Sequence, residues 1–259
     1  MTSAATPQAV TVAIDGPSGS GKSSVSRAVA TELGLRYLDT GAMFRALTWW
    51  CVDQGIDLAD QATVAQAAHD IPLSMGTDPG DPHVRVGETV VDSAIRTPAI
   101  SGVVSAVATN LGVRAQLADE QRRIIEEARD ANGGIVVEGR DITTVIAPDA
   151  EHRILLSASE EARLSRRSTE LSERGEAQQS HEIHDQVIRR DRDDATVSAF
   201  FSPADGVHGI DTSSLTFAQS VAAVLDVVRR GPIGEPTDTH TDTKTTSPAS
   251  HSTSDSGAS

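Results

Sequence analysis

The sequence contains little cysteine and no long apolar run. Cys51 is the one cysteine among 259 residues, which excludes an intrachain disulfide framework and fits a reducing compartment. No stretch approaches the roughly 18 apolar residues that a membrane-spanning helix needs, and residues 1–8 carry no pattern of the signal type. We therefore expect a cytoplasmic protein without a membrane partner.

Positive charge is also scarce. Lysine and arginine together number 22 against 37 acidic residues, which gives a formal net charge of −15. Nucleic acids select for basic surfaces, so this balance argues against them as partners, although it leaves room for a local pocket lined by arginine. The only lysines are Lys22 and Lys244. Because the chain otherwise uses arginine, the lysine at position 22 indicates a site that needs a compact ammonium group.

The most specific pattern in the chain surrounds Lys22. An apolar run at 10–14 precedes it and a helix-patterned stretch follows, which is the context that the phosphate-binding pattern G-x-x-x-x-G-K-[ST] requires. Glycines let the backbone N–H groups turn toward an anion, and the start of the helix adds its positive dipole end. We expect Lys22 to reach the terminal phosphates of a nucleotide and Ser23 to bind its Mg²⁺. The predicted nucleotide-binding residues are Gly16, Pro17, Ser18, Gly19, Ser20, Gly21, Lys22, Ser23 and Ser24.

Apolar periodicity predicts an α/β fold. Strands are expected at 10–15, 36–39, 135–137, 154–156 and 207–211, and helices at 23–33, 40–51, 160–173, 182–194 and 217–230. This alternation predicts a parallel sheet of five strands with helices on both faces. The runs at 135–137 and 154–156 are apolar without alternation, which is typical of central parallel strands.

Residues 52–100 interrupt the alternation. A polar, helix-like stretch at 58–69 is followed by a hairpin of 84–86 with 89–91, which predicts a small α+β insertion. Residues 95–131 return to helical periodicity and break near 110–112, so two consecutive helices are expected. We expect residues 1–8 to be flexible and residues 231–259, which are rich in Thr, Ser, Asp and Pro, to form a disordered tail.

Arginines follow two of the predicted strands. Arg45 comes after the second strand, and Arg140 lies in the polar sequence Glu-Gly-Arg-Asp at 138–141 after the third. Carboxyl ends of parallel strands face the ligand crevice, so both guanidinium groups are predicted to converge on a phosphate. Such groups neutralise an anionic acceptor during phosphoryl transfer. The chain lacks N-K-x-D and L-S-G-G-Q-type motifs, which disfavours a GTPase or a transporter ATPase. Taken alone, the charged run at 189–194 is typical of a solvated surface.

Five segments in register resemble the bacterial cytidylate kinases. They are residues 15–22, 38–45, 95–97, 138–141 with 148–150, and 190–191 with 194. The resemblance covers about residues 9–228 and implies the P-loop fold of nucleoside monophosphate kinases. It implies a domain at 9–230 with an acceptor-binding insertion at about 57–98 and a short lid at about 160–195. It also implies a monomer that transfers the γ-phosphoryl group of MgATP to CMP or dCMP.

The resemblance also implies roles for individual residues. Catalytic roles fall to Lys22, Arg140 and Arg190. Substrate contacts fall to Thr40, Arg45, Ser105, Arg114, Arg140, Asp141, Arg190 and Asp194, of which Arg45 and Arg140 would bind the acceptor phosphate. Cytosine presents an amino donor beside ring-nitrogen and carbonyl acceptors, which suits a carboxylate next to hydroxyl and guanidinium donors. Uracil has the opposite donor and acceptor pattern at two of these positions, so Asp141 should disfavour its binding.

The chain departs from its relatives in two places. Val197 stands where they often carry a third basic residue, and the following stretch is Phe-rich in place of Pro-Leu, so Arg189 and Arg192 are the candidates to compensate. Thr143 stands where glycine is common. Two alternative functions stay open: a P-loop kinase for another small acceptor, such as UMP or a nucleoside, and a nucleotide-binding regulator without turnover.

Overall fold

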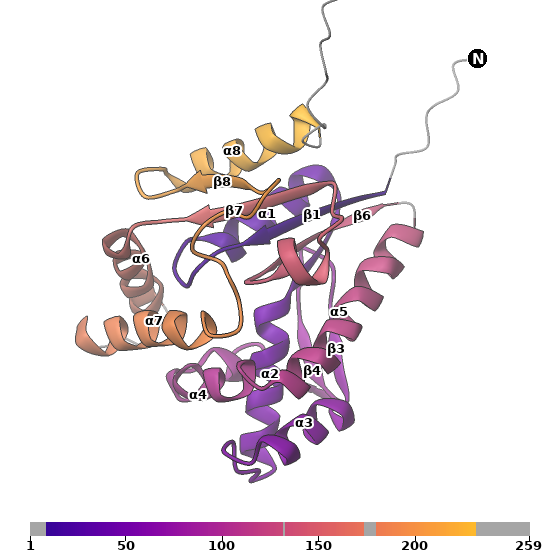
Figure 1. Ribbon diagram of the computed structural model, residues 1–259, viewed down its shortest axis with the longest axis vertical. Coiled ribbons are helices and arrows are strands. Elements are labelled where there is room, and N and C mark those ends of the chain that lie inside the picture. Colours follow the sequence, from indigo (N-terminus) through magenta and orange to yellow (C-terminus); the bar gives the residue numbers. More distant parts are fainter. Residues whose placement is uncertain (1–8, 132, 174–179, 232–259) are drawn as a thin grey trace, which may run out of the picture.

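A parallel sheet of five strands forms the centre of the molecule (Figure 1). The computed structural model describes residues 9–131, 133–173 and 180–231. The strands stand in the order β2-β6-β1-β7-β8, and every neighbouring pair is parallel. They are β1 (Val10–Asp15), β2 (Arg36–Asp39), β6 (Gly134–Gly139), β7 (His152–Ser157) and β8 (His208–Asp211). The predicted five-stranded parallel sheet is therefore confirmed.

Helices cover both faces of this sheet, as predicted. Because successive side chains of a strand point to opposite faces, Val136 of β6 packs with α1 (Lys22–Leu33) and α8 (Phe217–Arg230). Its neighbours Ile135 and Val137 pack on the other face with α2 (Thr40–Asp53), α3 (Gln61–Asp70) and α5 (Leu111–Asp130). All three β6 side chains are fully buried. The apolar sequence of β6 does not alternate because each face of the strand packs in a hydrophobic cluster.

The insertion lies at the end of the long axis away from α8 (Figure 1). The predicted hairpin is present as β4 (Val84–Val86) and β5 (Thr89–Val90). A further short strand, β3 (Leu73–Met75), pairs antiparallel with β4 and makes a sheet of three strands. Three residues are too short for a readable alternation, so this strand was not predicted. A 3₁₀ turn, η1 (Ala94–Arg96), then leads into the next helices.

The two consecutive helices expected at 95–131 are α4 (Pro98–Ala108) and α5. Asn110 separates them, because its side-chain oxygen accepts hydrogen bonds from the N–H groups of Gly112 and Val113 at 2.9 and 3.2 Å. An Asn in this position satisfies N–H groups that the first turn of α5 leaves without helical partners. Its side-chain amide also donates to Gln61 O at 2.8 Å, which ties α5 to α3.

A single turn of π-helix, η2 (Ile142–Ile146), follows β6 and was not predicted. The buried carboxylate of Asp15, at the end of β1, accepts hydrogen bonds from Ile142 N, Thr143 N and Thr143 Oγ1 at 2.6–2.9 Å. Thr143 therefore supplies a side-chain hydrogen bond that a glycine could not. This contact fixes the segment after β6 against the strand that leads into the phosphate loop.

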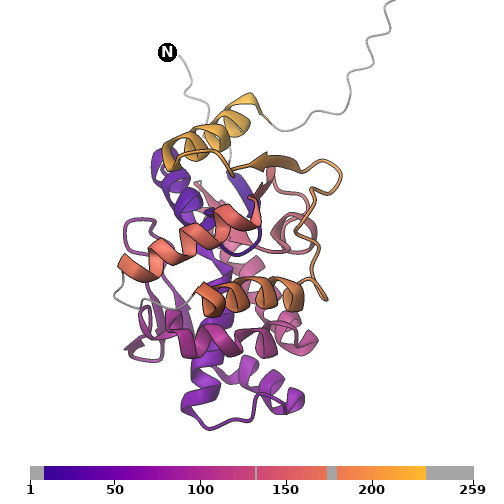
Figure 2. The ribbon, with the colours of Figure 1, turned by 90° about the vertical axis from the view of Figure 1, so that its left-hand side faces the viewer.

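Two charged helices, α6 (Glu160–Glu173) and α7 (Ser180–Asp194), face the viewer in Figure 2. They contact each other, and α7 also packs against α4. The expectations for residues 1–8 and for the tail from 232 onward concern residues outside those described, and so does the middle part, 174–179, of the lid expected at about 160–195. Among the described helices, none is long and apolar enough to cross a membrane.

Candidate active site

The phosphate loop joins β1 to α1. Gly19 and Gly21 have φ values of +76° and +87°, in the left-handed region that favours glycine. Gly16 has no room for a side chain, since a Cβ atom there would lie 2.3 Å from Leu156 O of β7. Gly21 precedes the first residue of α1 and makes no side-chain cap, which leaves the first N–H groups of the helix open. The loop can therefore bind an anion of phosphate size.

The ammonium group of Lys22 folds back over this loop. Its Nζ atom lies 3.4 Å from Pro17 O. Loss of solvation lowers the pKa of Lys22, and the carboxylate of Glu138 opposes that effect. A phosphate in the loop would stabilise the charged ammonium further, because it would add negative charge beside it.

Two carboxylates lie beside Lys22. Burial, followed by the charge of Asp39, raises the pKa of Glu138 to about 7, while a hydrogen bond with Ser23 opposes the shift. Glu138 also accepts a hydrogen bond from Tyr37 Oη at 3.2 Å. The Ser23 hydroxyl and the Glu138 carboxylate thus lie together, and both offer oxygen atoms, which are the ligands that Mg²⁺ prefers.

Asp39 ends β2 and caps α2. Its Oδ1 atom accepts from Ala42 N at 2.9 Å, and its Oδ2 atom lies 2.9 Å from Arg96 Nη2. Burial would raise the pKa of Asp39, but the Arg96 guanidinium and the Ala42 N–H outweigh it and hold that pKa below its usual range. The carboxylate of Asp39 is therefore ionised at neutral pH and fixes Arg96 at the edge of the site.

Two cavities meet at the phosphate loop. The larger, of about 870 Å³, extends from the loop along α6 to Leu215 and Phe217. The smaller, of about 150 Å³, lies among the carboxyl ends of β2 and β6 and the helices α4 and α7. Lys22, Ser23 and Arg167 line both cavities. One lysine is therefore shared by two neighbouring cavities.

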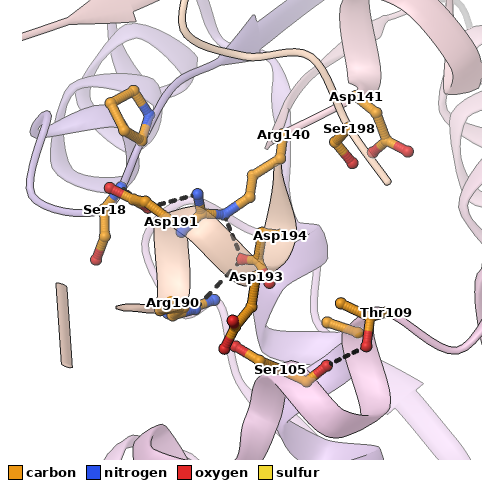
Figure 3. Close-up of polar contacts among 12 residues, drawn as sticks. Ser18, Ser105, Thr109, Arg140, Asp141, Arg190, Asp191, Asp193, Asp194 and Ser198 are labelled. Atoms are coloured by element: carbon orange, nitrogen blue, oxygen red, sulfur yellow. Dashed lines mark hydrogen bonds and ion pairs between the residues drawn. The ribbon is translucent and has the colours of Figure 1, made fainter. Parts of the chain in front are cut away.

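Arg140 and Arg190 line the smaller cavity and are held by carboxylates of α7 (Figure 3). Arg140 Nη1 lies 2.6 Å from Asp191 Oδ1, and Arg140 Nε lies 2.9 Å from Asp194 Oδ2. Arg190 Nε approaches the same Asp194 oxygen at 3.6 Å. The two acidic side chains are almost fully buried, and a guanidinium partner of each compensates its charge.

Arg45 approaches the same cavity from α2. Its Nη1 atom donates to Ser101 Oγ at 2.8 Å and to Ile95 O at 3.2 Å. Burial, and next the charge of Arg190, lower the pKa of Arg45 well below its usual range. Two guanidinium groups that repel each other in one cavity indicate a site for a bound anion.

Arg114 and Asp141 form an ion pair at another wall of the smaller cavity. Arg114 Nη2 also donates to Ser198 Oγ at 2.9 Å, so the segment after α7 helps to hold Arg114. Burial raises the pKa of Asp141, and the Arg114 charge opposes the shift. A carboxylate and a guanidinium that the family resemblance assigns to the base thus lie together in the smaller cavity.

The other two predicted substrate contacts differ in position. Thr40 lines the smaller cavity, where its Oγ1 atom donates to Glu138 O at 2.8 Å. Ser105 lies on α4 but is not among the residues that line either cavity. Its backbone oxygen accepts hydrogen bonds from Thr109 N and Oγ1 in the helix (Figure 3).

The two arginines expected to replace a missing basic residue point elsewhere. Arg189 Nη2 donates to Gly102 O of α4 at 2.9 Å, and Arg192 is exposed. Neither lines a cavity. The expectation that they compensate for Val197 is therefore not supported by their positions, because α7 directs Arg190 toward the smaller cavity while Arg189 and Arg192 are exposed.

Sequence reasoning missed three arginines of α6. Arg166 lines the larger cavity and donates to Ser20 O of the phosphate loop at 3.2 Å. Arg167 lines both cavities, and Arg163 is buried against the phosphate loop, where it donates to Ser18 O at 3.0 Å and pairs with Asp191. Asp191 Oδ1 in turn accepts from Ser18 N at 3.1 Å (Figure 3). From helical spacing alone, such residues are expected on a charged surface. Their burial depends on the tertiary packing of α6 and α7 against the phosphate loop.

Comparison with known proteins agrees with the resemblance carried by the five segments. The model of the cytidylate kinase family matches residues 12–230. A cytidylate kinase of Streptomyces avermitilis is 44 % identical over 226 residues, which cover 87 % of this chain and 95 % of the relative. Those of Streptomyces coelicolor and Cutibacterium acnes are 45 % identical and cover 90 % and 84 % of this chain, and 98 % and 95 % of the relatives. The chain therefore belongs to the cytidylate kinase family.

Proposed function

We propose that this chain transfers the γ-phosphoryl group of MgATP to CMP or dCMP, giving ADP and CDP or dCDP. The observation that carries the proposal is the pair of cavities that meet at Lys22 and Ser23, with guanidinium groups lining the smaller one. A donor in the larger cavity and an acceptor in the smaller one would face each other across Lys22. In-line transfer between two phosphates needs this arrangement.

The donor triphosphate would bind along residues 16–24. The open N–H groups at the start of α1 and the Lys22 ammonium would stabilise its negative charge. Ser23 and Glu138 offer the oxygen ligands for Mg²⁺, either directly or through its bound water. When bound, Mg²⁺ would neutralise charge on the donor phosphates and orient them.

The acceptor phosphate would bind to Arg45, Arg140 and Arg190. Each of these guanidinium groups lines the smaller cavity. Their combined charge would neutralise the acceptor before its oxygen approaches the donor. No general base is needed, because a phosphate oxygen is already ionised near neutral pH. We assign catalytic roles to Lys22, Arg140 and Arg190 on this basis.

The base would be read by Asp141, Arg114 and Thr40. Asp141 can accept a hydrogen bond from the exocyclic amino group of cytosine, and Arg114 can donate to its ring acceptors. Thr40 Oγ1 donates its proton to Glu138 O, so it would meet the base as an acceptor. Asp194, which contacts both Arg140 and Arg190, would contact the pentose. Uracil would present a carbonyl oxygen to Asp141, which is unfavourable for a carboxylate acceptor.

The test is ADP release with MgATP and CMP, dCMP, UMP, AMP or cytidine, for the wild type and Asp141→Ala. We expect turnover with CMP and dCMP, and a loss of about 10- to 1,000-fold or a loss of base preference in the variant. Preference for UMP or a nucleoside would keep the kinase chemistry and contradict the substrate. ATP binding without acceptor-dependent ADP release would favour a regulator.

The same proposal covers the state and location of the protein. Residues of one chain line both cavities, so a monomer suffices for the reaction. We propose that the protein acts as a cytoplasmic monomer on small-molecule substrates. Helices α6 and α7 would exclude water from the phosphates, which limits loss of the phosphoryl group to hydrolysis.

A further inference from the structure

The guanidinium group of Arg140 is restrained on two edges and on one face. Asp191 Oδ1 and Asp194 Oδ2 hold its edges at 2.6 and 2.9 Å (Figure 3). The face lies over the ring of Phe200, with 4.5 Å between Arg140 Cζ and the ring centre. The carboxylates belong to the charge network of the site. The proposed function as stated gives the ring no role.

Phe200 is anchored to the central sheet. Its side chain is fully buried and packs with Leu155 of β7 and with Val207, just before β8. Leu155 pairs in register with Asp15, the residue that precedes the phosphate loop. The position of the ring is therefore tied to the same strands that position the loop.

The ring supplies a restraint that the carboxylates cannot. The hydrogen bond to Asp191 and the ion pair with Asp194 hold two nitrogens of the guanidinium group but leave its plane able to tilt about the line through these two atoms. An aromatic face attracts a cation placed over it and opposes this tilt. Among the described residues, none accepts a hydrogen bond from Arg140 Nη2, and Arg140 lines the smaller cavity. That nitrogen is left as a donor for a phosphate oxygen.

We propose that Phe200 is a positioning residue that fixes the plane of Arg140 for the acceptor phosphate. This inference rests on the proposed function, because it assumes that Arg140 binds the acceptor. The Phe-rich segment after Val197 would then have a specific role in this chain, since a leucine side chain can fill space but cannot attract a guanidinium group.

The first experiment compares Phe200→Leu with Phe201→Leu. Phe201 is the matched control, because it is adjacent and 54 % exposed. We expect Phe200→Leu to lower kcat/KM for CMP about 5- to 30-fold and to leave the KM for MgATP within about twofold. The control should change neither value by more than about twofold. Equal effects of the two variants would overturn the inference.

The second experiment separates attraction from packing. Replacing Phe200 by mono-, di- and trifluorophenylalanine keeps the ring and weakens its negative face in steps, so kcat/KM for CMP should fall in steps. In an Arg140→Ala background, Phe200→Leu should cause no further loss. A flat response to fluorination, or an undiminished loss in that background, would contradict the role of Phe200. Absence of CMP turnover in the wild type would instead contradict the proposed function.

Discussion

Lys22 is the residue that both proposed ligands share. Its ammonium group lies at the phosphate loop. Loss of solvation lowers the pKa of Lys22, so the charged ammonium adds little to the stability of the fold. We expect Lys22→Ala to lower kcat about 100- to 1,000-fold, because it removes charge that the transition state needs. Coupled ADP release measures this effect.

The same variant should keep its fold. Glu138 loses a neighbouring positive charge, but its pKa is already raised to about 7, so it can take up a proton and the melting temperature should change little. Lys244→Ala, which changes the other lysine of the sequence, is the control and should keep full activity. Near-normal turnover in Lys22→Ala would contradict the account.

Glu138 gives the protein a predicted pH dependence of stability. Its pKa is raised to about 7 by burial and by Asp39. The folded chain therefore holds the proton more tightly than the unfolded chain, whose carboxyl group has its usual pKa of about 4.3. The contribution of Glu138 to stability is fully present below that usual value and is lost as pH rises to about 7.

Unfolding in denaturant should reveal this loss by comparison with Glu138→Gln. Between pH 4 and pH 7.5 the free energy of unfolding of the wild type should fall relative to the variant, by on the order of 1–3 kcal/mol. Subtracting the variant removes the titration of other groups. A constant difference across this range would show that Glu138 titrates normally.

At the scale of elements, the phosphate loop and α6 meet at Gly19. A Cβ atom on Gly19 would lie 2.8 Å from Arg163 O, and its φ of +76° already strains other residues. Gly34, which ends α1 with a φ of +65°, has nothing within 4 Å and serves as the matched control. Both Gly→Ala variants should lose about 1 kcal/mol of stability from backbone strain.

Only Gly19→Ala should also weaken nucleotide binding. The added methyl group must push α6 and the loop apart, so the KM for MgATP should rise about tenfold or more. Initial rates at varied MgATP, with melting curves for both variants, measure the two effects. A KM that changes equally in Gly19→Ala and Gly34→Ala would mean that backbone strain alone acts at the loop.

Sequence patterns predicted the long elements well and the short ones poorly. The five strands and the break at Asn110 carry clear apolar periodicity or a capping residue, and the structure confirms them. The strand β3 and the π-turn η2 have neither, since their formation depends on pairing with β4 and on the Asp15 carboxylate. Short elements of this kind are set by tertiary contacts that a local pattern does not contain.

The candidate site was predictable where a motif carries it. The phosphate loop, Arg140 and Asp141 follow buried strands directly, so topology alone brings them together. Arg163 and Asp191 lie on helices that looked like charged surface, and their burial depends on how α6 and α7 pack on the loop. The contact between the Phe200 ring and Arg140 could not be predicted from the sequence, which shows only an unusual pair of phenylalanines at this point.

At the scale of the whole molecule, the insertion, the sheet and the two charged helices surround one pair of cavities. The larger cavity reaches from α6 to the insertion residues Gly76 and His83, and the smaller is closed by α4 and α7. Elements from the first and last thirds of the chain thus meet at Lys22. Such an arrangement is suited to bringing two nucleotides together for phosphoryl transfer.

The measurement that tests the central claim most directly follows the γ-phosphoryl group itself. Wild-type protein is mixed with ATP labelled in the γ-phosphate, with and without CMP, and the products are separated. The account predicts label in CDP when CMP is present, and little inorganic phosphate in either case. Label that appears in inorganic phosphate at the same rate with or without CMP would contradict it, because the site would then deliver the group to water.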